Sequence, residues 1–188
     1  LLSIAPEPIT KVSVGDTHAL ALTVNGTIYC WGINKRGQCA SLTAGNEVWP
    51  PLRLYVGSAT APNVDIAAGS MHSVALSSTG AVFAWGFNHY GQACRTSNAL
   101  RGETPSVYDV GAVVGQAFYG RPIRQIAASR DASFFLSDEG RLFGCGSRSG
   151  MGFITPDGTP TSALFIDRPR EILVLPPDAD LALAWDSS

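Results

Sequence analysis

The sequence has few charged residues and no long apolar run, and each absence excludes a class of function. Only 15% of the 188 residues are charged, and the formal net charge is −2. A nucleic-acid-binding surface needs a clustered excess of Lys and Arg, which this balance does not supply. No apolar run reaches the roughly 18–20 residues that a transmembrane helix requires. We therefore expect neither specific nucleic-acid binding nor membrane insertion.

Cysteine is also scarce, and its spacing matches no metal site. The four residues Cys30, Cys39, Cys94 and Cys145 form no C-x-x-C pair and have no adjacent His. None of them recurs at its own position in the internal repeats described below, and cysteines that vary in this way are poor disulfide candidates. We predict four unpaired cysteines and an intracellular, reducing location.

Motifs for catalysis are missing too. The sequence contains no nucleophile elbow, phosphate-binding glycine loop, H-x-x-x-H pair or carboxylate dyad. Residues 146–150 (Gly-Ser-Arg-Ser-Gly) look like a glycine-rich hydrolase motif, but they align with residues 86–91 of the preceding repeat. We predict that the protein is not an enzyme and needs no cofactor and no metal.

The sequence does contain internal repetition. Residues 15–22 return as residues 69–76, a shift of 54 positions, and the same shift carries Trp31 onto Trp85. A further shift of 60 carries Gly80 onto Gly140. Repetition at this period indicates an array of similar units, each of which needs a neighbour to bury its apolar face.

Each unit is predicted to form four short antiparallel strands. Residues 18–23 and 72–77 alternate between two faces, as a strand between two packed layers does. Tight hairpins follow at Asn25-Gly26, Thr79-Gly80 and Glu139-Gly140, where a primed turn needs positive φ at both central residues. The predicted strands are residues 10–14, 18–23, 28–31 and 52–56 in the first unit; 64–68, 72–77, 82–85 and 106–110 in the second; and 124–128, 142–145 and 163–166 in the third, with 171–175 opening a fourth.

Four short strands per repeated unit predict an all-β fold, a partial β-propeller of four-stranded antiparallel blades. The predicted blades are residues 8–61, 62–121 and 122–168, and residues 169–188 begin a fourth within the single propeller segment 1–188.

Residues 66–76 and 85–92 resemble the repeat signature of the regulator of chromosome condensation family, and residues 31–38 look equally close. The third repeat departs from the pattern at Ser129, Ala132 and Cys145. Family propellers close into a ring of about seven blades. The resemblance therefore implies that the chain is a fragment or the ordered part of a longer protein, or that another chain completes the ring. We favour a fragment or the ordered part of a longer protein, and the missing initial Met agrees with this.

His18 and His72 occupy equivalent repeat positions and face the same way as the apolar residues that follow them. We predict that they are buried and tie the backbone of their own blade together, without a catalytic or metal-binding role. The residues to which we assign a structural role in the repeat are Gly15, His18, Trp31, Gly37, Gly69, His72, Trp85 and Gly91.

The candidate partner contacts lie outside this repeat pattern. Residues 34–36, 88–90 and 95–101 sit at comparable blade positions and are expected to share one face. An insertion at residues 112–121 adds aromatic and Arg side chains, which protein interfaces favour; it either forms an interface or folds back over its own blade. The candidates are Trp49, His89, Tyr90, Arg95, Arg101, Phe118, Tyr119 and Arg121.

We therefore predict a non-enzymatic scaffold, a subunit or assembly factor of a larger complex, that binds protein partners through loops between strands. An alternative that the family resemblance implies is guanine-nucleotide exchange on a small GTPase, which leaves no local motif. A second alternative is inhibition of an extracellular enzyme, which the lack of an export signal argues against. Chromatin binding, also known in the family, would need basic tails that this chain lacks.

Overall fold

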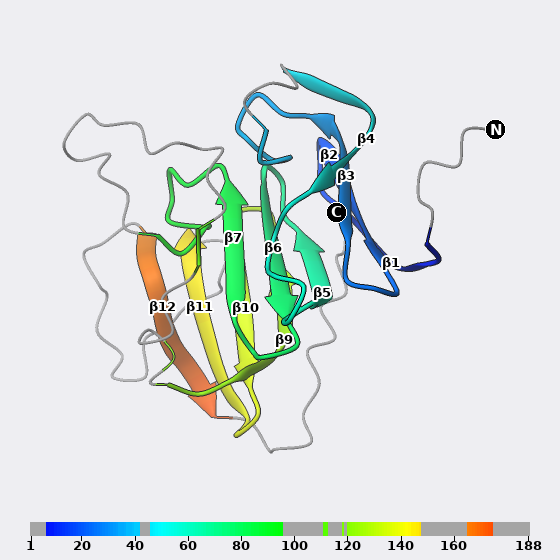
Figure 1. Ribbon diagram of the computed structural model, residues 1–188. Coiled ribbons are helices and arrows are strands. Elements are labelled where there is room, and N and C mark those ends of the chain that lie inside the picture. The colour runs from blue at the N-terminus through cyan, green and yellow to red at the C-terminus, as the bar shows by residue number, and fades with distance from the viewer. Residues whose placement is uncertain are drawn as a thin grey trace.

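Three antiparallel sheets of four strands each form the structure, a computed structural model that describes residues 7–41, 46–95, 111, 112, 118, 120–147 and 165–174 (Figure 1). In each sheet the strand order follows the chain. The strands are β1 (Ile9–Val14), β2 (His18–Thr23), β3 (Ile28–Ile33) and β4 (Glu47–Leu54); β5 (Asn63–Ala68), β6 (His72–Ser77), β7 (Val82–Gly86) and β8 (Gly111–Ala112); and β9 (Ile123–Ala128), β10 (Ala132–Ser137), β11 (Arg141–Ser147) and β12 (Phe165–Val174).

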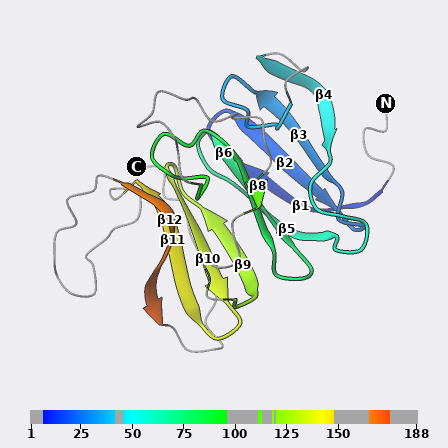
Figure 2. The ribbon, with the colours of Figure 1, turned by 60° about the vertical axis from the view of Figure 1, so that its left-hand side comes forward.

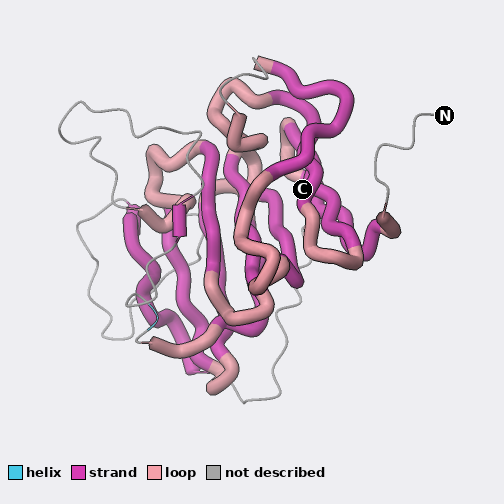
Figure 3. The backbone as a smooth tube through the Cα atoms, in the orientation of Figure 1, coloured by secondary structure: helices cyan, strands magenta, loops and turns pink. Residues whose placement is uncertain are grey.

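The three sheets pack face to face as successive blades, which Figure 2 shows from the side. Strand β5 contacts β1 and β2 of the first sheet, and β9 contacts β5 and β6 of the second. The first strand of the second and third sheets therefore packs against the first two strands of the preceding sheet. Figure 3 shows that these strands account for most of the described backbone, as the all-β prediction requires. No helix among the described residues is long and apolar enough to cross a membrane.

Each hairpin between the second and third strands turns on one glycine. Gly26, Gly80 and Gly140 have φ of 81°, 79° and 78°, whereas the residue before each of them is outside the left-handed region. In the first hairpin Gly26 N donates to Thr23 O at 3.0 Å. This is a three-residue loop that ends in a left-handed glycine. The predicted hairpin positions are correct, but the predicted primed turn is wrong, because only the glycine needs positive φ.

The outer strands differ from their predicted bounds. Strand β4 begins at Glu47, five positions before the predicted residue 52. Strand β12 runs from Phe165 to Val174 and pairs with β11 along this length. Residues 171–174, predicted to open a fourth unit, therefore belong to the third sheet. Pro169 lies inside this strand because an edge strand does not need its N–H for pairing. The predicted strand 106–110 and residue 175 lie outside the described residues.

Two apolar cores fill the spaces between the sheets. One contains Leu20, Ile66 and Trp85 between the first and second sheets, and all three are fully buried. The other lies between the second and third sheets and contains Phe135 and Phe143. The sheets are thus held together by burial of apolar side chains, at roughly 25 cal/mol per Å² of apolar surface removed from water.

Candidate interaction surface

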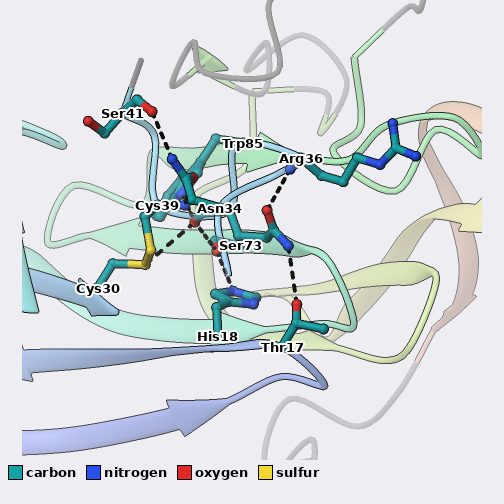
Figure 4. Close-up of a disulfide and its surroundings, with 10 residues drawn as sticks. Thr17, His18, Cys30, Asn34, Arg36, Cys39, Ser41, Ser73 and Trp85 are labelled. Atoms are coloured by element: carbon teal, nitrogen blue, oxygen red, sulfur yellow. Dashed lines mark hydrogen bonds between the residues drawn. A yellow bond between two sulfur atoms is a disulfide. The ribbon is translucent and has the colours of Figure 1, made fainter. Parts of the chain in front are cut away.

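A histidine–serine pair joins each sheet to the next. His18 Nε2 lies 2.8 Å from Ser73 Oγ in the second sheet, and Ser73 Oγ donates to the backbone oxygen of Gln38 at 2.9 Å (Figure 4). The contact repeats one blade further on, where His72 Nε2 lies 3.0 Å from Ser133 Oγ. Both histidines are buried as predicted, but their side chains bind the next blade instead of their own, which corrects the predicted role.

The proton positions in these pairs exclude a catalytic dyad. The Ser73 hydroxyl gives its proton to Gln38 O, so its oxygen accepts from His18 Nε2–H. Burial lowers the pKa of His18 to about 4, although the negative charge of Asp16 acts to raise it. Burial also lowers the pKa of His72 to about 3. Both histidines are therefore neutral at pH 7, and the serine, which is fully buried, cannot act as a nucleophile.

Two disulfides link the cysteines, so the prediction of unpaired thiols is wrong. Cys30 pairs with Cys39 in the first blade, and Cys94 pairs with Cys145 across the second and third blades. The Cα atoms of each pair are 5.4 Å apart, which is ordinary for a disulfide. The cysteines were predicted to be unpaired because they do not recur at equivalent repeat positions. This inference failed because the two disulfides themselves do not occupy equivalent positions. The intracellular location stays a prediction, now without this support.

Two side-chain amides shape the loop that follows β3. The side chain of Asn34 accepts a backbone N–H five residues further on, at 2.9 Å, and Gln38 Oε1 accepts from Arg36 N at 2.8 Å. Asn88 and Gln92 make the same two contacts in the loop after β7. All four amide side chains are buried. The sequence analysis placed Asn34 and Asn88 in loops expected to contact a partner and gave Gln38 and Gln92 no role, although the 54-residue shift carries each amide onto its counterpart.

These loops bring four side chains together at the junction of the first two blades. The Arg36 guanidinium carbon lies 5.2 Å from the centre of the Phe87 ring. The His89 ring stacks on Phe87 with centroids 6.0 Å apart, and the Tyr90 ring lies edge-on to His89 at 5.1 Å. Arg36 and His89 are exposed, and Tyr90 is 40% exposed. We call Arg36, Phe87, His89 and Tyr90 the aromatic–arginine patch.

The patch has the chemistry of a protein-binding surface. Arg and aromatic side chains are enriched where proteins contact one another, and rigid aromatic rings lose little entropy on binding. The buried amides of Asn34, Gln38, Asn88 and Gln92 hold the two loops in place before any partner arrives. Of the predicted contacts, the structure thus brings His89 and Tyr90 together. The sequence analysis missed Phe87, which it read only as part of the repeat.

The other predicted contacts are not part of the aromatic–arginine patch. Trp49 is 72% exposed on β4, and Arg95 is partly buried at the end of the loop after β7. Arg121 forms an ion pair with Glu139, which raises the pKa of Arg121, at the β10–β11 hairpin. That hairpin lies at the opposite end of the blades from the patch, because the patch loops follow the third strands. Arg101 and Tyr119 lie outside the described residues.

Phe118 is in the core. It is 2% exposed, and its ring centroid lies 5.2 Å from that of Phe135 and 5.5 Å from that of Phe143. Phe118 is therefore not an exposed partner contact, and the two rings that it contacts belong to β10 and β11 of the third blade instead of its own blade. Among the residues that the structure describes, no cluster of three His, Cys, Asp or Glu side chains is arranged to hold a metal.

Antiparallel four-stranded blades, joined through equivalent contacts, define a partial β-propeller. The family comparison agrees with this architecture. Residues 9–38 and 64–92 match the regulator of chromosome condensation (RCC1) repeat, and residues 25–76 match a second description of the same repeat. The chain therefore contains repeats of the RCC1 type within residues 9–92.

Individual relatives share this part of the fold. Human E3 ubiquitin-protein ligase HERC2 is 34% identical over 142 residues, which are 73% of this chain and 3% of HERC2. A structure of yeast RCC1 (Prp20) bound to Kap60 has a TM-score of 0.73 at 22% identity, over 92% of this chain and 39% of that one. Human WBSCR16 has a TM-score of 0.70 at 24% identity, over 88% of this chain and 39% of that one. The chain therefore spans only a minor part of each relative, and the structural likenesses show the fold alone.

Proposed function

We propose that this chain is a protein-interaction module that binds a protein partner through the aromatic–arginine patch. The observation that supports this most is the preorganised group of exposed Arg36, His89 and Tyr90 around Phe87. Each of the two loops that carry it is shaped by buried side-chain amides. A surface that is rigid before binding avoids part of the entropy loss of association.

The finer role that we favour is that of a scaffold in a larger complex. Yeast Prp20p has been studied for binding to Gsp1p and histones, and its propeller resembles this fold at 20% identity. That likeness keeps guanine-nucleotide exchange as the alternative. Exchange requires a GTPase partner that is released by GTP, whereas a scaffold holds its partners whether or not nucleotide is present.

Substitution of the patch is expected to weaken partner binding without weakening the fold. We expect Arg36→Ala and Tyr90→Ala each to lower affinity for the partner by about tenfold or more, because truncation of an aromatic or Arg anchor commonly costs 1–2 kcal/mol or more. Both side chains project from loops, so the midpoint of urea unfolding should stay nearly unchanged. The measurement is co-purification of the tagged protein followed by titration of the recovered partner.

The matched control is Tyr55→Ala. Tyr55 is 89% exposed and stacks near Arg53, with 5.7 Å between the guanidinium carbon and the ring centre. It follows β4, at the end of the first blade that is opposite to the patch loops. Equal loss of partner in Tyr55→Ala and Tyr90→Ala would place the binding surface elsewhere. Release of a stoichiometric small GTPase by GTP would favour exchange over the scaffold role.

A further inference from the structure

The two junctions between blades differ at one repeat position. At the first junction, the fully buried Trp85 donates from Nε1 to Gln38 O at 2.6 Å. At the second, Cys145 stands at the equivalent position, with its sulfur 3.7 Å from Gln92 O. A disulfide joins this cysteine to Cys94, two residues after Gln92. A covalent bond is therefore present where the other junction has a tryptophan hydrogen bond.

Cys145 supplies neither the indole hydrogen bond nor the apolar surface that Trp85 supplies at the first junction. A thiol is a weak donor and has much less apolar surface than an indole ring. Ser133 Oγ still donates to Gln92 O at 2.7 Å, as Ser73 Oγ donates to Gln38 O. The disulfide is thus the added link between the loop of the second blade and strand β11 of the third.

We propose that the Cys94–Cys145 disulfide is a redox-dependent clamp that replaces the repeat tryptophan and makes docking of the third blade depend on oxidation of this pair. Formation joins the two sulfur atoms and releases two protons and two electrons. The electrons reduce the disulfide of a thiol–disulfide oxidant, which leaves as two thiols. Cys94 is 4% exposed and Cys145 is fully buried. Thiol–disulfide exchange at this pair therefore requires the second and third blades to separate.

The Cys30–Cys39 disulfide supplies a matched control within the same chain. It joins residues nine positions apart in one blade, whereas Cys94 and Cys145 are 51 positions apart. The loop it closes is also held by the Trp85 and Ser73 hydrogen bonds to Gln38 O. Its removal should therefore act on that loop only, while removal of the longer cross-link should release a whole sheet.

Hydrogen exchange followed by mass spectrometry tests the clamp. We expect amides of β9, β10 and β11 to exchange about 100-fold faster in the double variant Cys94→Ala/Cys145→Ala than in the wild type, as expected for the loss of a long-range cross-link. The double variant Cys30→Ala/Cys39→Ala should change them only a few-fold. Alanine suits position 94, because Ala40 has φ of 47° at the equivalent repeat position and Cys94 has φ of 53°.

Wild-type protein provides a second measurement if the Cys94→Ala/Cys145→Ala variant does not fold. Peptide mapping without reductant should recover Cys94 and Cys145 in one pair of linked peptides. As reductant is added, hydrogen exchange should accelerate in the amides of the third sheet before it accelerates in those of the first sheet. Free thiols at both positions in protein refolded with a disulfide oxidant would overturn the proposal. So would equal protection of β9, β10 and β11 in the reduced and oxidised protein.

Discussion

The Gly69→Val protein is expected to be strongly destabilised at 25 °C. A Cβ atom at residue 69 would lie 2.6 Å from Ser129 O and 2.5 Å from His72 Nδ1. The first is backbone of the third blade, and the second belongs to the buried side chain that binds Ser133. Neither can move without opening the junction, so the change should cost more than about 3 kcal/mol, at the upper end for overpacking. Urea unfolding followed by circular dichroism measures it.

The control for this prediction is Gly120→Val. A Cβ atom at residue 120 meets nothing within 4 Å, although its φ of 75° disfavours a side chain. Backbone strain alone should cost about 1–2 kcal/mol there. If the two variants lost the same stability, close packing of the blades at Gly69 would not be the cause.

As the pH falls, the fold is expected to lose stability at pH values well above the pKa values of its buried histidines. Burial lowers the pKa of His18 to about 4 and that of His72 to about 3, from a usual value of 6.5. The unfolded chain therefore binds protons first as the pH falls below about 6.5, and stability decreases until the folded pKa values are reached. Between pH 7 and pH 5 the two sites together should remove about 4 kcal/mol from the free energy of unfolding.

Urea unfolding at several pH values tests this, and the slope against pH is the quantity of interest. The double variant His18→Gln/His72→Gln is expected to be less stable at pH 7 but to lose most of this slope. His89→Gln changes an exposed histidine of the patch and should keep the slope. A wild-type stability that stays constant from pH 7 to pH 5 would contradict neutral, buried histidines at the blade junctions.

The sequence predicts the sheets well because repetition and alternation reflect local backbone requirements. The hairpin glycines Gly26, Gly80 and Gly140 locate each turn, since positive φ favours glycine. Strand alternation predicts the burial of His18 and His72. The outer strands were harder to place, because their length is set by pairing with the third strand and leaves no repeated signal.

Contacts between blades could not be predicted from one repeat alone. His18 contacts Ser73, which is 55 positions further along the chain, and Cys94 pairs with Cys145, which is 51 positions further. Such partners can be identified only when the packing of the sheets is known. The same holds for the patch, where Arg36 of one loop meets Phe87 of the next. Local signals predicted that the polar loops share a face, but not which of their side chains meet.

Photocrosslinking from the patch tests the central claim most directly. A benzophenone amino acid would replace Tyr90 in one protein and Tyr55 in another, and each would be irradiated in cell extract and analysed by mass spectrometry. We predict one protein adduct of defined mass from position 90 and none from position 55. A specific adduct from position 55 alone, or no adduct from position 90 in extract that yields a co-purifying partner, would contradict binding through the aromatic–arginine patch.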